Sequence, residues 1–216
     1  ASMAPGRLPL PNLIPLGRIT ACPAVFVLAL LPSVGSRLFA FVLFLAAALS
    51  DLWDGYLARK HGWVTDLGKL LDPLADKLLL LATFLPIYIL SHRGGVVGAL
   101  PWWGPLPLWV VAIIFGRELA ITVFRAWAVR KGVVISAGTS GKRKALSQNL
   151  FAGGALLWYP LQMLSIEGGW SGPFWDFWRV LHGGWIGITL LLAILLTVYS
   201  MIDYFWRYRT LSGVKA

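Results

Sequence analysis

The chain has 216 residues, of which 58% are hydrophobic and only 13% are charged, and its mean hydropathy is +0.73. A soluble domain carries about 25% charged residues, whereas several apolar stretches here reach the roughly 20 residues that cross a bilayer. Composition therefore excludes an ordinary soluble protein. The net charge of +10 is compatible with nucleic-acid binding, but most basic residues stand at the ends of apolar segments. That placement favours anionic lipid headgroups over a nucleic-acid partner.

The apolar stretches predict an all-α integral membrane protein with six transmembrane helices, forming one membrane domain over residues 1–216. Residues 1–10 form an N-terminal segment in which Ala1 and Ser2, before Met3, are expected to be an expression remnant. Turns rich in Gly or Pro and basic loops separate the apolar stretches. We expect the helices at residues 11–31, 37–59, 67–91, 108–130, 142–164 and 181–206.

The placement of lysine and arginine orients the six helices. If the N-terminus is cytoplasmic, the outer connections hold only Arg37, Arg93 and Arg179 of the 19 basic residues. Cytoplasmic segments of membrane proteins carry the excess of Lys and Arg, so both termini are expected inside. We expect a bacterial-type plasma membrane and a polar site that faces the cytoplasm.

Acidic residues are concentrated in the second and third predicted helices. Five of the nine lie between Asp51 and Asp76. Asp51 and Asp54 are three residues apart, and Asp72 and Asp76 are four apart, so each pair shares one helix face. Because the two helices flank a short loop, the pairs can converge at the cytoplasmic end. Carboxylates are expensive inside a membrane and usually mark a functional site.

Four convergent carboxylates repel one another unless cations neutralise them. The cluster contains no Cys or His, and ligation by oxygen alone is typical of Mg²⁺ or Mn²⁺. Two such ions can clamp the attacking and leaving oxygens of a phosphate displacement. The small Gly55 and Ala58 would let a nucleotide approach the backbone closely, and Arg59 is suited to bind phosphate. The cluster therefore predicts a two-metal phosphoryl-transfer site rather than a set of helix-end charges.

The segment from Asp51 to Asp76 resembles the signature of the CDP-alcohol phosphatidyltransferase family, D-x2-D-G-x2-A-R-x8–9-G-x3-D-x3-D. Every specified position matches, at Asp51, Asp54, Gly55, Ala58, Arg59, Gly68, Asp72 and Asp76. The signature covers a short part of the chain, and the six-helix prediction for the rest agrees with the family's fold.

The resemblance implies a role for each position of the signature. Asp51, Asp54 and Asp72 bind two divalent cations, and Asp76 combines metal ligation with general-base chemistry on the acceptor hydroxyl. The donor implied is CDP-diacylglycerol, with CMP as the leaving group, and a homodimer is implied as well. The CDP-lipid site is implied to consist of Asp54, Gly55, Ala58, Arg59 and Gly68.

A second charged group lies in the fourth and fifth predicted helices. Arg117 and Arg125 are two turns apart on roughly the same face, and Lys142 and Lys144 start the fifth helix. Cations within membrane helices usually need an anionic partner, and a phosphate-bearing acceptor supplies one. Arg117 could instead pair with Glu118. Other basic residues could be cytoplasmic loop anchors: Arg130, Lys131, Lys142 and Arg143.

Further runs look like the branch of the family that uses sn-glycerol 3-phosphate and forms phosphatidylglycerophosphate. They are residues 8–19, 68–77, 116–125 and 141–144. Pro73 stands where the inositol-phosphate branch more often has a serine. Phosphatidylglycerol (as in cardiolipin synthases), inositol phosphate and serine stay open as alternative acceptors. A small cation- or proton-coupled transporter is the distant alternative, disfavoured because the acids cluster at one membrane side and no inverted repeat is visible.

Overall fold

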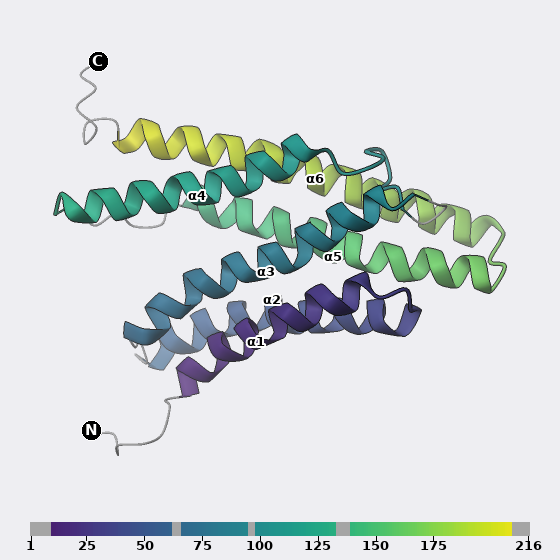
Figure 1. Ribbon diagram of the computed structural model, residues 1–216, viewed down its shortest axis with the longest axis horizontal. Helices are drawn as coiled ribbons and strands as arrows, with labels where there is room; N and C mark the ends of the chain where they lie inside the picture. The colour runs from purple at the N-terminus through teal and green to yellow at the C-terminus, as the bar shows by residue number, and fades with distance from the viewer. Residues whose placement is uncertain (1–9, 62–65, 95–97, 133–138, 209–216) are drawn as a thin grey trace.

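The computed structural model describes residues 10–61, 66–94, 98–132 and 139–208 (Figure 1). Side chains are described for these residues except 10–12, 52–61, 66–67, 69–70 and 139. The described residues form six α-helices and no strand, and an isolated bridge joins Leu100 to Gly104. The helices are α1 Leu10–Leu30, α2 Val34–His61, α3 Asp66–His92, α4 Leu108–Arg130, α5 Thr139–Glu167 and α6 Pro173–Tyr208. The all-helical prediction is confirmed.

Four of the helices contain segments that are long and apolar enough to cross a membrane. These segments are Leu13–Leu30, Val34–Asp51, Leu71–His92 and Pro173–Tyr208. Helix α4 has sufficient length but carries Arg117, Glu118 and Arg125 within it. The structure thus indicates an integral membrane protein, and the insertion of α4 and α5 stays a prediction.

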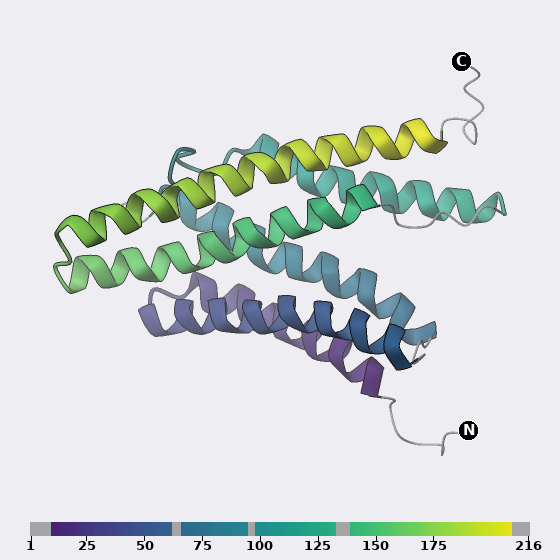
Figure 2. The ribbon, with the colours of Figure 1, turned by 180° about the vertical axis from the view of Figure 1, so that it is seen from behind.

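The helices run along one long axis in two groups of three (Figures 1 and 2). One group holds α1, α2 and α3, and the other holds α4, α5 and α6. Helix α5 packs against α2 and α3 and so joins the two groups. The start of α1, the end of α6 and the end of α4 lie at the same end of the molecule (Figure 1). We call this the acid end, because α2 ends and α3 begins there, and Asp51 and Asp76 lie in those parts of the two helices.

The packed core lies toward the opposite end, where the two groups meet. Phe44 of α2 and Phe84 of α3 are buried with Phe151 of α5, and the rings of Phe84 and Phe151 are 5.2 Å apart. A Cβ on Gly153 would lie 3.3 Å from the Phe44 ring. Small residues let membrane helices approach closely, so Gly153 allows α5 to lie against α2.

The sixth helix starts at Pro173, earlier than the predicted residue 181. Proline is favourable in the first helical turn because its missing N–H has no intrahelical partner there. Gly169 and Gly172 adopt positive φ angles and make the tight turn before it. The aromatic residues 174–178 therefore belong to the helix.

Candidate active site

A cavity of about 1200 Å³ lies between the two helix groups and is lined by residues from all six helices. Its acid end contains three of the four predicted aspartates, Asp51, Asp72 and Asp76. The facing wall there contains Arg117 and Lys144. Apolar side chains of α2, α5 and α6 line another part of it, so one continuous space joins a charged end to a hydrophobic arm.

The structure brings Asp51 of α2 and Asp76 of α3 together through a shared arginine. The Nη1 of Arg18 donates to Oδ1 of Asp51 at 2.7 Å, and its Nη2 donates to Oδ1 of Asp76 at 2.5 Å. Asp72 lies one turn before Asp76 and lines the same cavity. The convergence expected from the sequence is therefore seen for Asp51 and Asp76, and Asp72 lines the same cavity.

Four predicted CDP-site and metal-site residues lie outside the described side chains: Asp54, Gly55, Ala58 and Arg59. Gly68, the remaining predicted CDP-site residue, is half-buried on α3.

Arg18 is a site residue that the sequence reasoning missed. It is the only charged residue of α1, and its side chain is only 3% exposed. A lone arginine inside an apolar span needs an acidic partner, and that signal was present in the sequence. The partners could not be chosen, because they come from two other helices, 33 and 58 residues away.

The carboxylate oxygens at the acid end are suitable ligands for a divalent cation. Asp51 and Asp76 each use one oxygen for Arg18, and an ionised carboxylate has a second one. Oxygen ligands are those that Mg²⁺ and Mn²⁺ prefer. Among the side chains that the structure describes, no three acidic, His or Cys groups lie close enough to hold an ion. Asp54 is not among them, so the two-metal site stays a prediction.

Glu118 holds two of the predicted acceptor-binding cations. The Nη1 of Arg117 donates to Oε1 of Glu118 at 3.0 Å, and Lys144 forms an ion pair with the same oxygen. Arg117 also donates from Nε to the hydroxyl of Ser200 at 3.2 Å. Both cations are buried. The pairing of Arg117 with Glu118, left open by the sequence, is therefore seen, and this charged group joins α4, α5 and α6.

Arg125 and Lys142 are placed differently and line the same cavity. The guanidinium of Arg125 lies 5.7 Å from the ring centre of Tyr204. Its Nε is buried and has no hydrogen-bond partner within the described residues. Leaving a buried donor unpaired is costly, and an anion in the cavity would satisfy it. Lys142 is exposed. These two cations are thus better placed for a soluble anion than Lys144 is.

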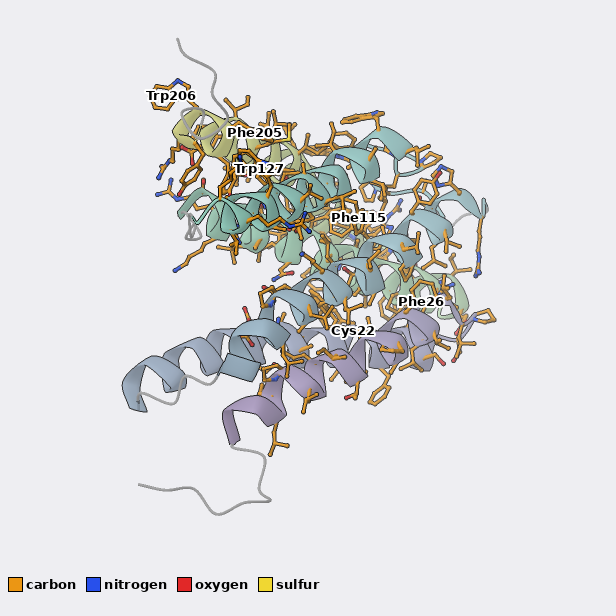
Figure 3. The ribbon with its side chains drawn as sticks, turned by 60° about the vertical axis from the view of Figure 1, so that its left-hand side comes forward. Cys22, Phe26, Phe115, Trp127, Phe205 and Trp206 are labelled. Carbon is orange, nitrogen blue, oxygen red and sulfur yellow. The ribbon has the colours of Figure 1, made fainter. Side chains whose placement is uncertain are left out.

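Aromatic and polar contacts hold the acid ends of α4, α5 and α6 together. Figure 3 shows Trp127 and Phe205 near one another at this end, while Trp206 points away from the bundle. Asp203 of α6 accepts from Ser140 of α5 at 2.8 Å and from Arg207 at 2.7 Å. These contacts therefore hold together α4 and α5, the helices that carry Arg125 and Lys142.

The apolar arm of the cavity runs between α2, α5 and α6. Phe41, Leu45 and Leu49 line it from α2 at four-residue spacing, which places them on one helix face. Trp185 of α6 also lines this arm, and a Cβ on Gly154 would lie 2.9 Å from its indole. Gly154 lies ten residues beyond Lys144, which is about 15 Å along a helix. The arm is therefore long enough for much of a lipid chain.

The chain was compared with known proteins. A model of the CDP-alcohol phosphatidyltransferase family matches residues 8–199. The chain is 35% identical over 211 residues to a probable phosphatidylglycerophosphate synthase of Mycobacterium tuberculosis, covering 95% of this chain and 85% of that protein. It is 33% identical over 210 residues to a CDP-diacylglycerol–glycerol-3-phosphate 3-phosphatidyltransferase of Bacillus subtilis, covering 91% and 93%. A protein of the same name in Pectobacterium atrosepticum is 33% identical over 199 residues, covering 90% and 92%.

Proposed function

The chain belongs to the CDP-alcohol phosphatidyltransferase family, and we propose that it transfers a phosphatidyl group from CDP-diacylglycerol to sn-glycerol 3-phosphate. The products are phosphatidylglycerophosphate and CMP, and the process is phospholipid biosynthesis. The observation that carries this assignment is the cavity, which joins an acid cluster, a group of cations and an apolar arm in one space. The names of the similar proteins, which include both substrates, support it.

The donor lipid occupies the acid end and the apolar arm together. When bound, two divalent cations, Mg²⁺ or Mn²⁺, held by Asp51, Asp54, Asp72 and Asp76, neutralise the charge of the pyrophosphate. Gly55, Ala58, Arg59 and Gly68 line the CDP moiety. One acyl chain follows the α2 face of Phe41, Leu45 and Leu49 toward Trp185.

The acceptor phosphate binds at the opposite wall of the cavity. Arg125 has a buried donor without a partner among the described residues, and Lys142 is exposed. Arg117 and Lys144 line the same cavity and add to its positive charge. Charge-assisted hydrogen bonds to phosphate orient the acceptor as well as bind it, so its hydroxyl faces the aspartates.

Asp76 accepts the proton of the attacking hydroxyl. Its carboxylate is 60% exposed to the cavity, and Arg18 fixes its orientation. The hydroxyl oxygen forms a bond to the lipid-side phosphorus, the bond from that phosphorus to the CMP oxygen breaks, and the proton passes to Asp76. General-base catalysis of this kind requires the base to lie within hydrogen-bond reach of the hydroxyl. Binding of the acceptor phosphate at the opposite wall brings the hydroxyl within that reach of Asp76.

All six helices cross the membrane in this proposal, with both termini and the acid end in the cytoplasm. The charged groups of α4 and α5 then lie beside the cavity rather than in lipid, where they would be costly. The protein is located in a bacterial-type plasma membrane as a homodimer.

The test is a transfer assay with the purified protein in mixed micelles. Labelled sn-glycerol 3-phosphate should enter the lipid fraction only when CDP-diacylglycerol and Mg²⁺ or Mn²⁺ are present, with one CMP released per lipid formed. Asp176→Asn is a matched control, because this exposed acid lies in the first turn of α6, at the end away from the acid end. Folded, metal-supplied protein that makes no labelled lipid would overturn the proposal.

An acceptor panel in the same assay separates the alternatives. Phosphatidylglycerol, inositol phosphate and serine are each offered in place of sn-glycerol 3-phosphate. We expect sn-glycerol 3-phosphate to give the highest kcat/KM. Faster turnover with another acceptor would keep the chemistry and replace the acceptor, while CMP release that needs both substrates would exclude a transporter.

A further inference from the structure

We propose that Arg18 is a positioning residue, a fixed cation that clamps Asp51 to Asp76 before metal ions bind and stays in place afterwards. The inference rests on the proposed function for its view of these aspartates as metal ligands. It goes beyond that function because it assigns a role to α1, which contributes no predicted metal ligand, substrate-binding residue or base.

The geometry of the contact suits a clamp. The two terminal nitrogens of one guanidinium reach two carboxylates on different helices, at 2.7 Å to Asp51 and 2.5 Å to Asp76. The planar, rigid fork of arginine sets the distance between its two acceptors, which a single lysine ammonium does not. Among the described contacts, each carboxylate uses only its Oδ1, for Arg18, which leaves the Oδ2 atoms for a metal ion.

Burial fixes the clamp to the scaffold. The Arg18 side chain is 3% exposed, whereas those of Asp51 and Asp76 are 44% and 60% exposed. The arginine therefore lies deeper in the protein than the two carboxylates, at the base of the same cavity. Helix α1 packs against both α2 and α3, so it can hold the two acid-bearing helices in register.

Other cations near the acids have partners elsewhere. Lys77, the residue after Asp76, donates to the hydroxyl of Thr122 on α4 at 2.8 Å. Arg117 and Lys144 both bond to Glu118. Among the described contacts, Arg18 is thus the cation that offsets the repulsion between Asp51 and Asp76. Residues that orient metal ligands from behind typically change metal affinity by about 10- to 100-fold when lost.

The experiment uses the whole protein without any lipid substrate. Thermal unfolding is measured in EDTA, and Mn²⁺ binding is measured by the loss of the free Mn²⁺ EPR signal. We expect Arg18→Gln to unfold at a lower temperature in EDTA and to bind Mn²⁺ at least about tenfold more weakly. Arg37→Gln is the matched control: Arg37 is a partly buried arginine that donates to Leu31 O, away from the cavity lining. It should leave Mn²⁺ affinity unchanged.

Two further variants keep the test decisive. Arg18→Lys retains the charge, so it should fold even if Arg18→Gln does not, yet it should still bind Mn²⁺ more weakly because it lacks the fork. In an Asp51→Asn background, Arg18→Gln should lower the unfolding temperature less than in the parent, as coupled residues do.

Tighter Mn²⁺ binding by Arg18→Gln would overturn the proposal, because it would mean that Arg18 only fills the place of a metal ion. Unchanged metal-free stability together with unchanged Mn²⁺ affinity would overturn it equally. Neither readout involves CDP-diacylglycerol or an acceptor, so failure of the proposed transfer reaction is distinguishable from failure of the clamp.

Discussion

Two buried cations meet the same physical requirement on opposite walls of the cavity. Arg18 pairs with Asp51 and Asp76, and Lys144 pairs with Glu118. A charge taken out of water is tolerated when it is paired and hydrogen-bonded, and removal of one partner of a buried pair costs about 3–5 kcal/mol. The structure therefore separates cations held by protein carboxylates from Arg125, for which no ion pair is seen among the described residues.

Asp76→Asn tests the assignment of the base. An asparagine of the same size keeps an acceptor oxygen for Arg18 but does not take a proton, so turnover should fall by about 10²- to 10⁴-fold. The thermal unfolding temperature should change by only a few degrees. Transfer of labelled sn-glycerol 3-phosphate measures the first effect, with Asp176→Asn as the control. Near-normal turnover in Asp76→Asn would remove this residue as the base.

Arg125→Gln tests the acceptor wall. Loss of a charged hydrogen bond to phosphate costs about 1.5–3 kcal/mol, so KM for sn-glycerol 3-phosphate should rise by about 10- to 100-fold. KM for CDP-diacylglycerol should stay the same, because the proposed donor site is at the aspartates of α2 and α3, on the opposite wall of the cavity from Arg125. Arg130→Gln, an exposed arginine of the last turn of α4, is the control. An equal rise in both KM values would show a general loss of structure instead.

The sequence predicted single residues well where the signal was local. A spacing of four residues placed Asp72 with Asp76, and a spacing of eight placed Arg117 with Arg125; both pairs line the cavity, because side chains at such spacings share a helix face. It did not predict that Arg18 joins α2 to α3, since that contact depends on how α1 packs against both. The pairing of Lys144 with Glu118 depends likewise on how α4 and α5 both pack against α6.

At the scale of helices, apolar length was the reliable signal. The bounds of α4 were predicted as residues 108–130 and are found there. The start of α6 was missed because the glycines and aromatic residues before residue 181 resemble an interfacial turn. In the structure, Gly183 and Gly187 lie inside α6, where a Cβ would contact Pro101 and Trp102 of the connection between α3 and α4. These glycines serve packing rather than a break in the helix.

Gly154→Val tests the apolar arm between α5 and α6. A Cβ at this position would lie 2.9 Å from Trp185, so the larger residue should push the indole into the arm. Overpacking costs about 1–3 kcal/mol, and we expect the preference for dipalmitoyl over dioctanoyl CDP-diacylglycerol to fall by about tenfold. Gly184→Ala is the control, because its Cβ would make only an ordinary 3.7 Å contact. An unchanged chain-length preference would place the acyl chain elsewhere.

At the scale of the whole molecule, the two helix groups bring unlike charges to one cavity. The α1–α3 group carries the aspartates, and the α4–α6 group carries the cations that face them. In the proposed reaction, donor and acceptor therefore meet between the groups. The sequence predicted which end of each helix is polar, but not which helices are neighbours, because close packing in a membrane depends on the fit of small residues such as Gly153.

The orientation of the whole molecule is tested by labelling single cysteines. Cys22 is the only cysteine and is buried, so in a Cys22→Ala background the introduced cysteine is the only thiol that can be labelled. Lys131 follows α4 at the acid end, and Ser171 lies in the turn between α5 and α6; both are exposed. Because the basic excess marks the cytoplasmic side, a membrane-impermeant maleimide should label Lys131→Cys only in inverted vesicles and Ser171→Cys only in intact spheroplasts. The reverse pattern would place the aspartates and the donor's CDP group outside the cell, where no cytoplasmic nucleotide could reach them.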